Sequence, residues 1–321
     1  MSKKLEYNAA TPLYTSDALA WRIDQLDGAM SGLLAAGKPL VVFVHGRGDE
    51  PAKSLRGGSS FAKGLAVHKI ELGYRASVLM FNWDSAFRKP FVLDRTRPLA
   101  HAGAGGKSLA AFLAALRAWR QAHPGHPAPV LLVHSMGSIV LQHAVEEGGW
   151  LNGEAIFRHV VLSEPDADDV GHADWLERLA ARESVFVTFN ADDKVLRKST
   201  DDRPHGAHAL GLGTDQPLAP GARYIDLTGM GAVGSDKDDD HEVFGKGAMN
   251  GQRFVCQFFE QALRGDDVLL DPASNVESVS RGQVYRLRVE YAPDAPCLQI
   301  PKLPQEKVPD AFAGLPPSSG G

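Results

Sequence analysis

"PVLLVHSMGSIVLQHA", residues 129–144, is the stretch that decides the fold. An apolar run ends abruptly at "HSMG", and a second apolar segment with helical spacing follows. This pattern predicts a strand, a tight turn and a helix, with one serine exposed at the turn. The usual signature of such a nucleophile elbow is Gly-x-Ser-x-Gly, but Val133 replaces the first glycine here, and Gly137 keeps the second. We therefore expect Ser135 to be a nucleophile; the alternative is a buried strand followed by an incidental serine.

Six short apolar runs along the chain predict strands. Each run is continuous rather than alternating, as is typical of strands buried on both faces of a parallel sheet. They are residues 39–44, 76–81, 130–133, 159–162, 184–189 and 223–227. Segments with helical periodicity lie between or after them, at 61–72, 107–123, 139–145, 175–181 and 254–263. This alternation predicts right-handed crossovers and a doubly wound, mostly parallel α/β sheet.

The ends of the chain differ from this central part. Residues 1–37 contain one amphipathic helix, expected around 19–34, and form a helical lead-in. Residues 38–265 are expected to fold as one domain. The extension at 266–321 begins with the pattern of a hairpin or two short strands, and its proline-rich tail has a composition that favours disorder.

The composition excludes several classes of protein. A net charge of −5 provides no basic surface for nucleic acid or an anionic membrane. Cys256 and Cys297 are too few for a disulfide framework, which favours a reducing compartment. No apolar stretch has the length of a membrane span, and the N-terminus lacks the apolar core of a signal peptide. We expect a cytoplasmic protein with a small-molecule substrate; the oligomeric state stays open.

The residues that follow the predicted strands suggest a chemistry. Ligands of open α/β sheets bind beyond the carboxyl ends of the strands. There the chain carries first "HGRG", then Ser135, then "NADD" at 190–193, and finally His241. The order Ser, Asp, His is that of the α/β-hydrolases. Serine needs a neighbouring imidazole to take its proton, and the imidazole needs an acid to orient it.

Two backbone N–H groups are expected to form an oxyanion hole. The N–H of Met136 follows the nucleophile at a helix N-terminus, where a developing negative charge is stabilised. Gly46 and Gly48 would let the first loop approach the reacting carbon closely, so the N–H of Arg47 is the expected second donor. The alternative is a simple strand-to-helix turn.

The acid and the histidine each have competitors. Asp193 is favoured because "DKVL" follows a strand end, but Asp192 and Asp166 also follow strand ends. His241, in "DHEVFG", comes after the last strand of the domain and is the favoured base. His134 precedes the nucleophile and would point away from it. His205 and His208 lie in the long loop at 197–221, and most of the chain's twelve histidines are expected at the surface or at helix caps.

Two further motifs resemble ligand sites only superficially. "HAGAGGKS" ends like a phosphate-binding loop, but His101 stands where the first glycine is required, and we expect Ser108 to cap the following helix instead. Asp236, Asp238 and Asp240 have calcium-loop spacing, but His241 replaces the required glycine. We therefore expect no metal and no organic cofactor.

Taken together, these segments resemble the α/β-hydrolase superfamily, and most closely an uncharacterised bacterial branch of it. The similarity runs in register over roughly residues 38–245 and includes "VVFVHGRGD", "FNWDS", "VHSMGSIVL", "VVLSEPDADD" and "VFVTFNADDKVL". The resemblance implies that Ser135 is the nucleophile, Asp193 the acid and His241 the base, with Arg47 and Met136 as oxyanion donors. It does not extend to the C-terminal extension and implies no particular substrate.

The expected reaction is hydrolysis of a carboxylic ester through an acyl-enzyme. The segment at 164–183 is too short for a full cap domain, which favours small or soluble acyl substrates, although the loop at 197–221 could act as a lid. Acyl transfer and thioester or amide cleavage use the same residues and stay open. A non-catalytic binding or scaffolding protein on the same fold is the alternative from another class.

Overall fold

The computed structural model describes residues 8–16, 19–47, 66–85, 96–199, 203, 206–230, 241–244 and 251–292. The strands in this part of the chain form one sheet in the order β2-β1-β4-β3-β5-β6-β7-β8-β10-β9. The six predicted strands are confirmed as β3 to β8, and they run parallel in the middle of the sheet. Their bounds are Leu40–Val44, Ser77–Phe81, Val130–His134, Val160–Ser163, Val185–Phe189 and Arg223–Asp226.

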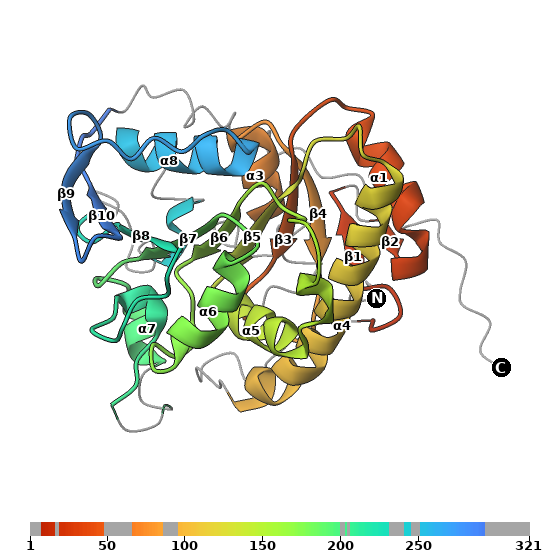
Figure 1. Cartoon of the computed structure of the whole chain (residues 1–321), viewed down its shortest axis with the longest axis horizontal. Coiled ribbons are helices and arrows are strands. Elements are labelled where there is room, and N and C mark those ends of the chain that lie inside the picture. The colour runs from red at the N-terminus through yellow and green to blue at the C-terminus, as the bar shows by residue number, and fades with distance from the viewer. Residues whose placement is uncertain are drawn as a thin grey trace, which may run out of the picture.

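Helices cover both faces of the sheet, which confirms the doubly wound α/β architecture (Figure 1). One face packs against α1 (Leu26–Leu34), α4 (Thr96–Ala122), α5 (Gly137–Glu147) and α6 (His172–Ala180). The other face packs against α3 (Ala66–Gly73) and α8 (Arg253–Arg264). The short helix α7 (Lys194–Lys198) follows β7. Short 3-10 helices lie at Ile23–Gln25, Gly149–Leu151 and Leu210–Leu212. No described helix combines the length and apolarity needed to cross a membrane.

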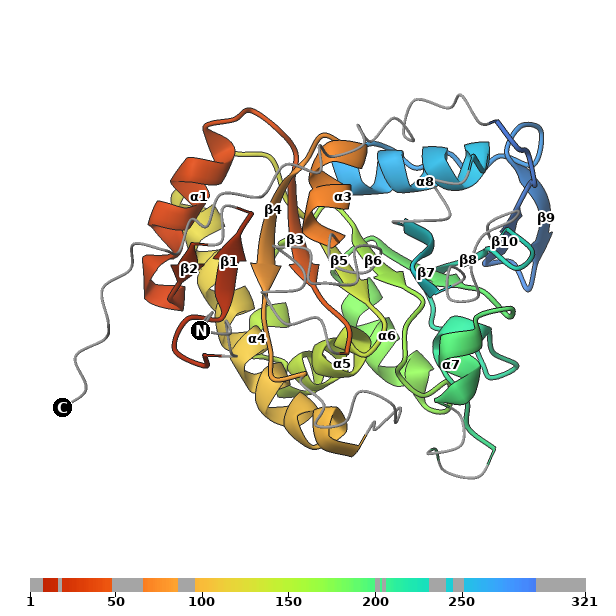
Figure 2. The ribbon, with the colours of Figure 1, turned by 180° about the vertical axis from the view of Figure 1, so that it is seen from behind.

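Both ends of the chain add strands to the sheet. The lead-in is not purely helical, because β1 (Leu13–Thr15) pairs antiparallel with β4 and with β2 (Ala20–Trp21) at one edge (Figure 2). At the other edge, β9 (Val276–Ser280) and β10 (Val284–Leu287) form the hairpin that the sequence pattern suggests, and β10 runs parallel to β8. The first part of the C-terminal extension therefore continues the central sheet.

The cysteine content needs a different interpretation from the one its low count suggests. Two cysteines are too few for a disulfide framework, but Cys256 on α8 is disulfide-bonded. The other cysteine of the chain, Cys297, lies outside the described residues. The argument for a reducing compartment from the number of cysteines therefore does not hold.

Helix α4 begins earlier than its periodicity predicts, and the prediction that Ser108 caps it is wrong. The helix starts at Thr96, so Ser108 lies in its middle. Pro98 falls in the first turn, where its missing N–H needs no partner. Gly105 and Gly106 face α5: a Cβ on Gly106 would lie 2.3 Å from the Cβ of His143. The glycines of "HAGAGGKS" thus allow two helices to pack closely and form no phosphate loop.

Candidate active site

Ser135 occupies the sharp turn between β5 and α5. Its φ of +52° is in the left-handed region, which is strained for a residue with a side chain. Its N–H donates to the carbonyl of Ser163 on β6, and its own carbonyl accepts from the Asp166 N–H, both at 3.0 Å. These bonds hold the strained turn against the neighbouring strand. The serine is 7% exposed.

Two glycines make room for this turn. A Cβ on Gly137 would lie 2.7 Å from the carbonyl oxygen of His45, and a Cβ on Gly46 would lie 2.9 Å from the Cβ of Ser135. Both distances are too short for a real side chain, so the turn and the loop after β3 touch only because neither position carries one. Val133 stands where the first glycine of the Gly-x-Ser-x-Gly signature is usual, and its side chain is fully buried in the core under α5. The elbow therefore tolerates valine at this position.

The structure brings Ser135, His241 and Asp193 together. The His241 Nε2 is 3.0 Å from the Ser135 Oγ, and the His241 Nδ1 is 2.6 Å from the Asp193 Oδ2. With Nδ1–H donating to the carboxylate, Nε2 is free to accept the serine proton. Burial lowers the pKa of His241, but the charge and hydrogen bond of Asp193 outweigh it, and the pKa is raised above its ordinary 6.5.

The competing acids have other partners. Asp192 pairs with Arg197 at 3.4 Å and accepts the Gly229 N–H. Asp166 is buried, and its carboxylate binds Arg203 and the hydroxyl of Ser199. Neither carboxylate has a hydrogen bond to His241 among the described residues. The geometry therefore selects Asp193 among the three candidates that the sequence leaves open.

The two expected oxyanion donors belong to the elbow itself and to the loop after β3. Met136 is the N-cap residue of α5, and no carbonyl or side chain in the described part of the chain accepts its N–H. Arg47 follows Gly46 in the loop that touches Ser135. That loop is held by His45, whose Nδ1–H donates to the Gly46 carbonyl at 2.8 Å and whose own carbonyl accepts the Trp83 indole N–H. Gly48 is outside the described residues.

A buried carboxyl group that the sequence does not single out, that of Glu164, lies near His241 and Asp193. Glu164 directly follows β6 with a φ of +41°, is fully buried, and accepts hydrogen bonds from the hydroxyls of Ser163 and Thr188. Burial, together with the charge of Asp193, raises its pKa to about 8, against the hydrogen bond from Ser163 and the charge of His241, which lower it. A charged residue at a strand end is expected to face solvent. The position of Glu164 in the sequence therefore does not predict its burial beside His241 and Asp193.

The other sequence candidates lie outside this cluster. His208 contacts Asp169 at 3.6 Å and bonds the neighbouring Ala209 carbonyl, and His205 is outside the described residues, as are the acidic positions 236–240. Within the described ranges, no three His, Cys, Asp or Glu side chains are grouped to hold a metal ion. Between β6 and β7 the only described helix is α6, so no cap domain is inserted there.

The loop after α7 is tied to the body of the protein where the structure describes it. The N–H groups of Leu210 and Gly211 donate to the carbonyls of Ala167 and Pro165, and the Gly211 carbonyl accepts from Asn190. A Cβ on Gly211 would lie 2.7 Å from the backbone of Glu164. The part of this loop at 206–222 is therefore bonded to the segments after β6 and β7, unlike a lid that opens and closes.

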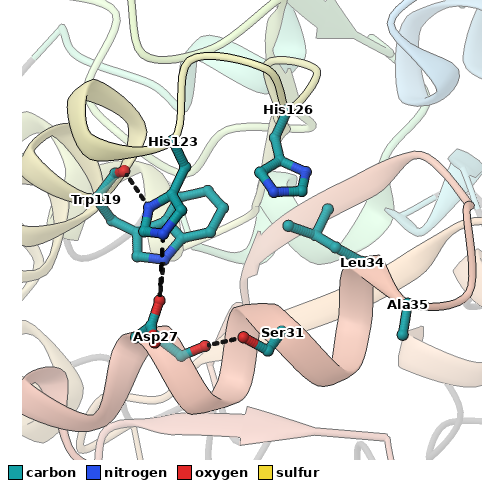
Figure 3. A pocket seen from close by; sticks show the side chains of 7 residues that line it. All are labelled: Asp27, Ser31, Leu34, Ala35, Trp119, His123 and His126. Carbon is teal, nitrogen blue, oxygen red and sulfur yellow. Dashed lines mark hydrogen bonds and ion pairs between the residues drawn. The ribbon is translucent and has the colours of Figure 1, made fainter.

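A pocket of about 310 Å³ lies between α1 and the end of α4, away from Ser135 (Figure 3). Trp119 and His123 stack there with ring centroids 4.5 Å apart, and Asp27 accepts the indole N–H. This end of α4 leads into the start of β5, whereas Ser135 follows the end of β5. The pocket therefore lies at the amino-terminal end of β5, whereas the serine lies at its carboxyl end.

Comparisons with known proteins agree with this architecture. The model of the family described as "Alpha/beta hydrolase of unknown function (DUF900)" matches residues 32–210. No curated protein matches the sequence.

Solved structures that match part of the chain have low sequence identity to it. A predicted CIB-like hydrolase from Thermoplasma acidophilum is 14% identical, with a TM-score of 0.31 over 65% of this chain and 80% of its own. A thermostable esterase is 16% identical, with a TM-score of 0.33 over 69% of this chain and 54% of its own. An uncharacterised protein from Capnocytophaga ochracea DSM 7271 is 11% identical, with a TM-score of 0.36 over 70% and 56%. The family model covers more than half of the 321 residues, and the chain therefore belongs to this alpha/beta hydrolase family.

Proposed function

We propose that the protein hydrolyses a carboxylic ester through an acyl-enzyme on Ser135. The observation that carries the proposal is the continuous hydrogen-bonded contact from Ser135 through His241 to Asp193. A serine in a strained turn, an imidazole with a free Nε2 and a buried carboxylate on Nδ1 are the groups that acyl transfer needs.

The reaction proceeds in two halves. His241 takes the Ser135 proton as Oγ attacks the ester carbonyl, and the oxygen that becomes negative binds the N–H groups of Met136 and Arg47. The imidazolium, stabilised by Asp193, then protonates the leaving alcohol. Water attacks the acyl-serine in the second half, with His241 again accepting the proton and returning it to Oγ.

The test uses a fluorophosphonate, which reacts covalently with activated serines. Intact mass after exposure is expected to show one adduct on the wild type and none on Ser135→Ala. Both proteins must show the same circular dichroism spectrum, so that a missing adduct reports the missing hydroxyl. If the folded wild type gives no adduct, the esterase proposal fails and a non-catalytic binding role becomes the better explanation. If Ser135→Ala still gives the adduct, another serine is the nucleophile.

A further inference from the structure

Besides the two bonds of the His241 ring to Asp193 and Ser135, three contacts hold the segment His241–Phe244 to the body of the protein. The His134 ring donates from Nε2 to the His241 carbonyl at 2.9 Å. Lys69 of α3 pairs with Glu242 at 3.3 Å, and both side chains are largely buried. The hydroxyl of Tyr74 donates to the Phe244 carbonyl. The contact from Tyr74 holds the far end of the segment, that from Lys69 holds Glu242, and that from His134 holds the backbone of His241.

His134 is built into this junction on all sides. Its ring centroid is 4.9 Å from that of His241 and 5.3 Å from that of Phe244. Burial lowers its pKa to about 3, so the ring is neutral and carries one proton. A carbonyl oxygen can only accept, so this proton must be on Nε2. The unprotonated Nδ1 faces Gly46, where an added Cβ would lie 3.2 Å from it.

The position of His134 in the chain couples two parts of the site. It is the last residue of β5, and Ser135 follows it directly. Any shift of the His241 backbone relative to β5 therefore changes the 3.0 Å separation between the His241 Nε2 and the Ser135 Oγ.

We propose that His134 is a positioning residue that fixes the His241 backbone against the strand carrying the nucleophile, through its Nε2–H bond to the His241 carbonyl. The inference rests on the proposed function, since it gives His241 the role of base. His134 touches neither the substrate nor the reacting atoms. It acts through His241, by keeping Nε2 within reach of the serine hydroxyl.

Two variants separate the hydrogen bond from the packing. His134→Gln keeps an amide N–H close to the position of Nε2, whereas His134→Met has similar length and no donor. Misplacing a reacting group by about 1 Å costs roughly a hundredfold in rate. We expect His134→Met to lower kcat and the rate of fluorophosphonate labelling at least about tenfold with KM nearly unchanged, and His134→Gln to recover most of the loss.

The acid limb of the pH–rate profile supplies a second readout. Asp193 raises the pKa of His241, and a displaced imidazole loses this contact. In His134→Met the acid limb is therefore expected to move to lower pH. A merely destabilised protein with an intact site would keep the limb of the wild type.

His159 provides a matched control. It is also buried, and its Nε2 donates to a loop carbonyl, that of Asp266, at 2.7 Å, but it lies just before β6, at the opposite end of the strand from the site. His159→Met removes the same kind of bond and is expected to lower the melting temperature without changing the labelling rate.

The outcomes distinguish the inference from the proposed function. Absence of labelling on the wild type rejects the esterase proposal, and the inference with it. Normal labelling of a folded His134→Met, or equal impairment of the Met and Gln variants, overturns the inference alone. If His134→Met does not fold, nitrogen NMR of the wild type decides: the neutral Nε2–H tautomer of His134 supports the inference, and the Nδ1–H tautomer overturns it.

Discussion

The two carboxylate oxygens of Asp193 have different partners. Oδ1 accepts the N–H groups of Val195 and Leu196 and so caps the N-terminus of α7, while Oδ2 binds the His241 Nδ1. The N–H groups at the start of α7 thus hold the carboxylate in the orientation in which Oδ2 binds the imidazole. This contact pattern explains why "DKVL" marks the acid: the aspartate is an N-cap, and the next apolar residues anchor its helix.

Asp193→Asn separates these two roles. The amide oxygen can still cap α7, but the amide nitrogen cannot accept the His241 Nδ1–H, which forces the imidazole into the wrong tautomer. We expect kcat to fall by roughly 10⁴-fold, the cost typical of this change in serine proteases, with little change in the free energy of unfolding.

Asp166→Asn weakens a buried pair with Arg203 and is expected to cost about 3 kcal/mol or more of stability.

Ester kinetics and denaturant unfolding of both variants check this assignment. A folded Asp166→Asn protein with a kcat as low as that expected for Asp193→Asn would contradict the assignment. Full activity in Asp193→Asn would remove it from the site altogether.

The raised pKa of His241 sets the acid limb of the reaction. Only the neutral imidazole can accept the serine proton, so kcat/KM must fall as the pH drops through this pKa. We expect the midpoint of the limb above 6.5 in the wild type, because Asp193 raises the pKa more than burial lowers it. In Asp193→Asn the residual activity should show a lower midpoint, and a pH–rate profile of both proteins checks the shift. An unchanged midpoint would mean that the limb belongs to another group.

At the scale of elements, close packing of α4 on α5 sets the position of the elbow helix. Gly106 lies against His143 and the Val140 carbonyl of α5, whereas Gly103 of the same helix has no atom within 4 Å of an added Cβ. The two glycines therefore respond oppositely to alanine. Gly103→Ala should stabilise the protein by about 0.5–1 kcal/mol through helix propensity. Gly106→Ala should destabilise it by about 1–3 kcal/mol through overpacking. Denaturant melts of both variants test the difference in sign.

The same helix shows what the sequence could and could not predict. Apolar runs predicted the six parallel strands, because strands buried on both faces carry that pattern whatever their neighbours are. The start of α4 was missed because proline and glycines disfavour a helix locally, and only the contact with α5 outweighs them. The strand β1 has three residues and β2 has two, too few for any periodicity.

The positions after the strand ends predict the residues proposed for the site, but they do not predict which residues contact them. His134 contacts a residue 107 positions away, and Arg203 reaches Asp166 across 37 positions. No local pattern encodes such pairs. His134 in particular was expected only to point away from Ser135, and its bond to the His241 carbonyl appears only once β5 and the 241–244 segment are folded against each other.

For the whole molecule, buried titratable groups couple stability to pH in two opposite directions. Burial lowers the pKa of His45 to about 4 and that of His134 to about 3. Between these values and 6.5 the unfolded chain binds protons that the folded protein does not, so these residues make stability rise with pH. Burial raises the pKa of Glu164 to about 8 from an ordinary 4.5. In that range the folded protein holds the extra proton, so this residue makes stability fall as pH rises.

Above pH 6.5 the contributions of His45 and His134 are complete, and the fall from Glu164 continues to about pH 8. Glu183, whose pKa burial raises to about 7, and His241, whose pKa is raised above 6.5, add falls of the same sign. We therefore expect the free energy of unfolding to decrease between pH 6.5 and 8, with a slope approaching about 1.4 kcal/mol per pH unit for each proton held only by the folded protein. Glu164→Gln keeps an oxygen to accept the Ser163 hydroxyl and has no proton to lose, so its slope should be clearly shallower. Denaturant unfolding of both proteins across this range measures the slopes. Parallel slopes would mean that Glu164 is already ionised in the folded protein at pH 6.5, with its charge balanced by His241 beside it.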